Sequence, residues 1–109
     1  MSSLLVPSQA PAHLALFNIS STTLRAVWAQ VPECCRHGII RGYRLFLRDS
    51  NTGEFVRIEK TEAGQYKFEF SLLLKFYRYS VSVLAFTIKG DGPTIETSAM
   101  TDEDGKQAF

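Results

Sequence analysis

The sequence has 109 residues, with 12 basic and 11 acidic side chains and a formal charge of +1. The length suits one domain, and 45% hydrophobic residues allow a two-layer core without metals or disulfide staples. The balanced charge argues against nucleic-acid binding by bulk electrostatics and against a charged disordered tail.

Short runs of alternating apolar and polar residues, separated by turn residues, predict strands along the chain. The runs lie at residues 14–19, 24–29, 43–48, 55–59, 68–70, 79–86 and 94–101. Seven short strands in about a hundred residues predict an all-β sandwich of the immunoglobulin class.

Turn residues and the chain ends set the expected boundaries. Residues 1–10 are expected to be a linker, 11–101 the domain and 102–109 a C-terminal tail. The segments 49–53 and 89–93 are rich in Asp, Asn and Gly and are predicted as tight turns. No apolar run reaches membrane-spanning length, and the first residues lack the pattern of a signal peptide.

Several residues stand in a characteristic order and spacing along the chain: Trp28, Gly42-Tyr43, Leu73, Tyr79, Gly90, Gly92, Pro93 and Thr101. In this order they resemble the fibronectin type III family over about residues 11–101. Trp28 stands where the family buries a tryptophan, and Gly42-Tyr43 resembles the entry to its strand C. Leu73 and Tyr79 match the spacing of its E–F corner and strand F, although Lys75 replaces a proline that is usual there.

The resemblance implies a seven-stranded sandwich in which an A-B-E sheet packs on a C-C′-F-G sheet. It also implies that Trp28, Tyr43, Leu73 and Tyr79 are structural core residues rather than ligand contacts. Tyr79 is then the tyrosine-corner residue, whose hydroxyl bonds to backbone upstream. Gly90, Gly92 and Pro93 match the F–G turn of the family, and Thr101 matches its closing threonine.

No constellation for catalysis or cofactor binding emerges, because no phosphate loop, paired-histidine helix or nucleophile elbow is present. The only cysteines, Cys34 and Cys35, are adjacent and cannot join two distant strands. Two free thiols are the plain interpretation. A vicinal disulfide is an alternative, and a metal site with His37 is a weaker one because a fourth ligand is missing.

Two short motifs have a plain and a functional interpretation. Lys89-Gly90-Asp91 resembles an integrin-binding tripeptide, so its residues are candidate loop contacts, but the family's ordinary turn chemistry explains it better. Asn18-Ile19-Ser20 is a glycosylation sequon, which matters only in a secretory context.

Strand phase yields one candidate partner surface. If Tyr43 and Tyr79 point inward, the outward residues of the same strands include Phe46, Leu84 and Phe86. Arg44 and Arg48 flank this expected apolar patch. Such a patch often marks a protein interface, unless a neighbouring domain covers it or its residues are scattered singly.

The resemblance implies a non-enzymatic protein-interaction or spacer module in the extracellular part of a cell-surface receptor or adhesion protein. Its partners would be proteins or neighbouring domains of the same chain, without nucleic acid or direct membrane contact. An intracellular structural module of a cytoskeletal or scaffold protein is one alternative, and an accessory carbohydrate-binding module is another. Reduced cysteines would favour the intracellular alternative.

Overall fold

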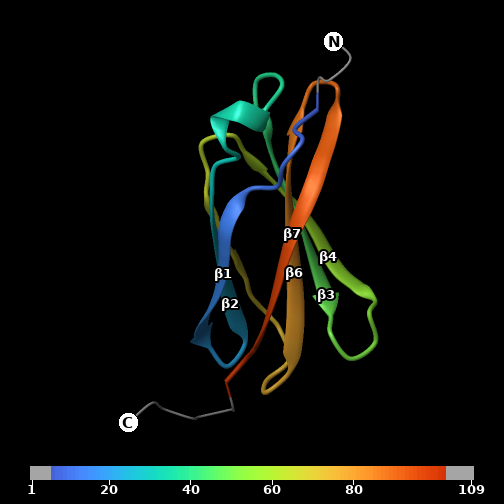
Figure 1. The fold of residues 1–109 in the computed structure, drawn as a ribbon. Helices are drawn as coiled ribbons and strands as arrows, with labels where there is room; N and C mark the ends of the chain where they lie inside the picture. The colour runs from blue at the N-terminus through green and yellow to red at the C-terminus, as the bar shows by residue number, and fades with distance from the viewer. Residues whose placement is uncertain (1–5, 103–109) are drawn as a thin grey trace.

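The computed structural model describes residues 6–102 and folds them into two antiparallel sheets that pack face to face (Figure 1). One sheet has the strand order β1-β2-β5 and the other β4-β3-β6-β7. The elements are β1 (Ala12–Ser20), β2 (Thr23–Ala29), a 3₁₀ turn η1 (Glu33–Cys35), β3 (Gly42–Asp49), β4 (Phe55–Glu62), β5 (Lys67–Phe70), β6 (Arg78–Thr87) and β7 (Gly90–Met100). The order is that of an A-B-E sheet on a C-C′-F-G sheet, so the predicted fold is confirmed.

The core lies between the sheets because alternate residues of β2, β3 and β6 point inward. The Trp28 and Tyr43 rings meet edge to face, with centroids 5.5 Å apart. The buried core consists of Leu24, Ala26, Trp28, Val31, Cys35, Tyr43, Leu45, Leu47, Phe70, Leu73, Tyr79, Val81, Val83 and Ala85. Within residues 6–102, no helix is long and apolar enough to cross a membrane.

The connection between β5 and β6 closes the end of the sandwich where the C-terminus leaves (Figure 1). The Tyr79 hydroxyl accepts the Leu74 N–H at 2.9 Å, which is the hydrogen bond of a tyrosine corner. The buried Thr101 hydroxyl donates to the Leu74 carbonyl at 2.7 Å and accepts the Tyr77 N–H at 2.9 Å. The end of β7 is therefore tied to this corner.

Part of the segment expected to be an N-terminal linker packs on the sandwich. Pro7 is buried, and the Ser8 N–H donates to the Cys35 carbonyl at 2.8 Å. A Cβ on Gly92 would lie 2.8 Å from the Pro7 Cβ, so the segment packs where only glycine fits. Residues 7 and 8 of the expected linker over 1–10 therefore contact the rest of the domain, and residues 1–5 lie outside the described part.

The C-terminal boundary also moves. Asp102 was expected to begin a tail, but its carbonyl accepts the Phe76 N–H at 3.0 Å. Residue 102 is therefore attached to the domain, and residues 103–109 lie outside the described part of the chain.

The hairpin between β6 and β7 turns earlier than predicted. Thr87 pairs with Gly90, so only Ile88 and Lys89 form the turn and residues 90–93 belong to β7. Gly90 has φ 146°, a backbone conformation that favours glycine. Pro93 is tolerated within β7 because this strand lies at the edge of its sheet.

Candidate functional site

The outer face of the four-stranded sheet carries the candidate surface, and the register of β3 and β6 fixes its composition. Arg44 lies opposite Leu84, and Phe46 lies opposite Ser82. Since Tyr43 belongs to the core, these alternate neighbours face away from it. The outward phase expected for Phe46, Leu84 and Phe86 therefore agrees with the register.

The solvent exposure expected for these three apolar side chains is wrong. Leu84 is only 6% exposed because it lies on a central strand between Arg44 on β3 and Thr94 on β7. Phe46 and Phe86 are half-buried. The three residues do not form an exposed apolar patch by themselves.

Two cations lie near the Phe86 ring. The Arg44 guanidinium carbon lies 4.5 Å from the ring centroid, and the Lys60 ammonium nitrogen lies 5.7 Å from it. Arg44 also bonds the Asp91 carboxylate at 3.1 Å. The ring packs over Gly42, where an added Cβ would come within 3.0 Å of it. Phe86 therefore supports the sheet and offers little free surface.

The exposed apolar surface lies instead on β4. Phe55 and Ile58 are each 60% exposed, and Ile58 lies opposite Phe46. The Phe55 and Phe46 ring centroids are 6.0 Å apart, and the Arg48 guanidinium carbon lies 5.1 Å from the centroid of Phe55. We call Phe46, Arg48, Phe55 and Ile58 the outer-face cluster. Sequence reasoning missed its β4 half, which only the pairing of β4 with β3 brings beside Phe46.

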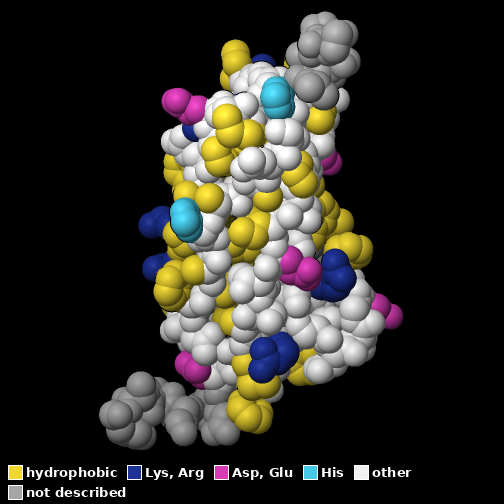
Figure 2. Space-filling view, viewed as in Figure 1, with side chains coloured by type: hydrophobic (Ala, Val, Ile, Leu, Met, Phe, Trp, Pro, Cys, Tyr) yellow, Lys and Arg dark blue, Asp and Glu magenta, His cyan; other side chains and the backbone are white. Residues whose placement is uncertain are grey.

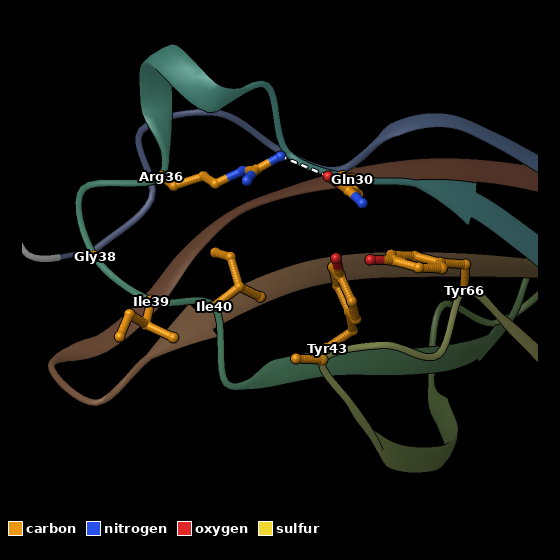
Figure 3. Close-up of a pocket in the computed structure, with 8 residues that line it drawn as sticks. Gln30, Arg36, Gly38, Ile39, Ile40, Tyr43 and Tyr66 are labelled. Atoms are coloured by element: carbon orange, nitrogen blue, oxygen red, sulfur yellow. Dashed lines mark hydrogen bonds between the residues drawn. The ribbon is translucent and has the colours of Figure 1, made fainter.

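A second feature is an open hollow of about 350 Å³ near the end that carries η1 (Figure 3). The Arg36 side chain is fixed there by the Val31 carbonyl at 2.8 Å and the Gln30 amide oxygen at 2.6 Å. The hydroxyls of Tyr43 and Tyr66 point toward one another (Figure 3). The lining residues are Gln30, Arg36, Gly38, Ile39, Ile40, Tyr43, Ala63 and Tyr66.

The side chains around this hollow offer hydrogen-bonding groups and the Arg36 guanidinium. Burial, followed by the neighbouring Tyr66, raises the pKa of Tyr43 to about 12, so its hydroxyl stays protonated at neutral pH. None of the residues around the hollow is a serine, cysteine or histidine that would act as a nucleophile or its base.

The two cysteines are joined as a vicinal disulfide, in place of the two free thiols that the sequence favoured. Cys34 is exposed, whereas Cys35 is 9% exposed and belongs to the core. The His37 Nε2 lies 3.0 Å from the Ser8 hydroxyl. Among residues 6–102 no three potential metal ligands converge, and the bonded sulfurs leave no thiolates for a metal.

The two short motifs occupy different places. Gly90 and Asp91 lie within β7 and not in a loop, and Arg44 holds the Asp91 carboxylate. The tripeptide is therefore not presented as a projecting loop contact. Asn18 is exposed on β1, at the edge of its sheet, and its side-chain amide donates to the Asp102 carboxylate at 2.9 Å.

Comparison with known proteins identifies the same fold. A scan against models of protein families finds no match. The third fibronectin III domain of the human KIAA0343 protein superposes with a TM-score of 0.80 at 22% identity, covering 94% of this chain and 89% of that one. This similarity shows a common fold.

Similar sequences occur inside much longer proteins. The neural cell adhesion molecule L1 of Takifugu rubripes is 34% identical over 106 residues, which covers 90% of this chain and 8% of that protein. The cell adhesion molecule DSCAML1 of Gallus gallus is 33% identical over 88 residues, which covers 80% of this chain and 4% of that protein. The chain thus spans less than a tenth of either relative.

Proposed function

The chain is a single domain of the fibronectin type III fold, and we propose that it is a non-enzymatic protein-recognition module in the ectodomain of a cell-surface adhesion or receptor protein. Two long relatives named as cell adhesion molecules support this compartment and class. Fold alone does not specify function, so the proposal depends on a surface suited to recognition.

The outer-face cluster is the observation that carries the proposal. Phe55 and Ile58 are each 60% exposed, and the Arg48 guanidinium lies beside the Phe55 ring. A few residues carry most of the binding energy at protein interfaces, and aromatic residues and arginine are enriched at interfaces. The partner that fits is a protein surface with an apolar centre and carboxylates placed to meet Arg48 and Lys60.

Substitution of the outer-face cluster should weaken binding to the partner protein without unfolding the domain. The probe is the fluorescently labelled ectodomain of the parent protein. It is applied to cells from the tissue in which the parent protein is expressed. The double variant Phe55→Glu/Ile58→Glu should bind at least about tenfold less, because two interface anchors are lost and carboxylates face the partner's carboxylates. Bound fluorescence at graded concentrations measures the change.

The matched control is Phe17→Glu, which alters a phenylalanine that is 52% exposed on β1 of the other sheet. It should bind like the unaltered protein. If the double variant keeps its unfolding temperature and still binds normally, the outer face is not the recognition surface. Leu84 is not substituted in this experiment, because it is buried and its replacement would alter folding as well as binding.

A glycan on Asn18 would support the extracellular compartment. The exposed amide on an edge strand is accessible to the transferase, and Ser20 completes the sequon. After secretion from animal cells, enzymatic removal of N-glycans should lower the intact mass of the protein and of Ser20→Thr. It should leave Asn18→Gln and Ser20→Ala unchanged. An unaltered mass in the parental sequence would contradict this assignment.

The two alternatives have less support. The vicinal disulfide suits an oxidising compartment, whereas the intracellular alternative calls for free thiols. A carbohydrate-binding face needs several exposed aromatic rings in a row. Phe86 is covered by Arg44, and Phe46 is half-buried against Phe55, so the outer face presents mainly the Phe55 ring.

A further inference from the structure

The proposed function makes no use of the disulfide between Cys34 and Cys35. A disulfide stabilises a fold mainly by removing loop-closure entropy from the unfolded chain, and the effect grows with the length of the closed loop. Here the sequence separation is 1, so the closed loop is the shortest that a chain can form. The bond therefore adds little to the stability of the sandwich, and its effect is local.

The bond is accessible from solvent on one side. Cys34 is exposed on η1, whereas Cys35 packs in the core. Figure 2 shows hydrophobic side chains, the colour class that includes cysteine and proline, at the surface of this end of the molecule. Thiol–disulfide exchange begins when a thiolate reaches one of the two sulfurs, and exposed disulfides are the labile or regulatory ones. A thiol in solution therefore has access to Cys34 while the sandwich remains closed.

The residue on the buried side of the bond holds the N-terminal segment, which we define as residues 6–8. The Cys35 carbonyl accepts the Ser8 N–H at 2.8 Å, and the His37 Nε2 lies 3.0 Å from the Ser8 hydroxyl. The neighbouring Pro7 is buried against Gly92 of β7. Figure 1 shows the segment running between η1 and the start of β7. The attachment of this segment thus depends on the conformation of η1.

The disulfide constrains the backbone that makes these contacts. The bond closes a small ring that contains the peptide group between the two cysteines. The N–H of that peptide group donates to the Pro32 carbonyl at 3.0 Å, and the Cys35 carbonyl lies one residue further along the backbone. Cleavage of the bond opens the ring and returns conformational freedom to the torsions between the cysteines. The hydrogen bond to Ser8 then loses a fixed acceptor.

We propose that the Cys34–Cys35 bond is a reversible redox site for a dithiol, and that its reduction releases the N-terminal segment while the sandwich stays folded. A thiolate of the dithiol attacks the Cys34 sulfur, the S–S bond breaks, and the Cys35 sulfur leaves as a thiolate that takes up a proton. The second thiol of the reductant then attacks the mixed disulfide and releases the Cys34 thiol. The domain gains two electrons and two protons and the dithiol becomes a disulfide, so an oxidised dithiol reverses the reaction.

Amide hydrogen exchange resolved by NMR tests this proposal on the complete chain. The protein is measured as the disulfide and after incubation with dithiothreitol at neutral pH without denaturant. Alkylation of unfolded samples, read by intact mass, should find no thiol before the incubation and both thiols after it. The Ser8 amide should exchange at least about fivefold faster after reduction, whereas the amides of Val81 and Val83 in the core should keep their rates.

Two variants separate the bond from other effects of the reductant. Cys34→Ser removes the exposed partner and leaves Cys35 as a thiol, so its Ser8 amide should exchange at the fast rate with or without dithiothreitol. Glu33→Ser, at an exposed position of the same turn, keeps the bond and should respond to dithiothreitol like the parental chain.

Three results would overturn the proposal. In the first, dithiothreitol leaves the bond intact in the folded protein. In the second, the Ser8 amide exchanges at the same rate in both redox states. In the third, reduction accelerates the amides of β6 as much as that of Ser8, which would make the bond a staple of the whole fold. None of these results depends on binding by the outer-face cluster on β3 and β4, so this proposal and the proposed function fail separately.

Discussion

Trp28→Ala should lower the free energy of unfolding by about 3–5 kcal/mol, the range for deleting a buried tryptophan or phenylalanine. Trp28 is 3% exposed, and its ring meets Tyr43 edge to face between the two sheets. The loss combines the transfer of a large apolar side chain with the cavity that remains. Since small domains are stable by only about 5–15 kcal/mol, this loss removes a large share of the total free energy of unfolding.

Urea unfolding followed by far-ultraviolet circular dichroism measures this change, because Trp28 is the single tryptophan and its fluorescence disappears with it. Trp28→Phe should cost less, about 1–2 kcal/mol, since most of the apolar volume stays. Phe17→Ala, at an exposed ring on β1, should change stability by under about 0.5 kcal/mol. A Trp28→Ala variant as stable as Phe17→Ala would show that the two sheets do not share the packed interior described above.

The fold was predictable because the central strands β2, β3 and β6 each have one buried face. In β2 and β3 buried residues alternate with half-buried ones over most of the strand, and in β6 every inward residue from Tyr79 to Ala85 is buried, which fixes both the strands and their phase. The turn before β7 was missed for a local reason. The glycines and Pro93 suggested a turn, but in an edge strand both residue types are tolerated, and the chain reverses at Ile88 and Lys89.

The candidate surface was predictable only in part. Strand phase gives the direction of Phe46 and Leu84 but not their exposure, which depends on the length of the side chains on neighbouring strands. Phe55 and Ile58 become relevant only through the register of β4 on β3. The docking of Pro7 on Gly92 also depends on contacts far apart in the sequence, which no local pattern reveals.

Thr101→Val should lower the free energy of unfolding by about 2–3 kcal/mol, although the two side chains have nearly the same shape. The Thr101 hydroxyl serves the Leu74 carbonyl and the Tyr77 N–H at once, and Thr101 is 2% exposed. Valine leaves both backbone groups without this partner, and each loss costs about 1–1.5 kcal/mol in a partly buried site. Chemical denaturation followed by tyrosine fluorescence or circular dichroism gives the value.

Two threonine variants separate the hydroxyl from the methyl group. Thr101→Ser keeps both hydrogen bonds and loses one buried methyl, so it should cost only about 0.8 kcal/mol. Thr94→Val makes the same chemical change at an exposed position of β7 and should stay within about 0.5 kcal/mol of the parental sequence. If Thr101→Val is as stable as Thr94→Val, the tie between the end of β7 and the corner contributes nothing. If Thr101→Val is destabilised as expected, amide hydrogen exchange over residues 71–77 of the isolated chain should also become faster. The reason is that the Thr101 hydroxyl holds the connection between β5 and β6 in its conformation.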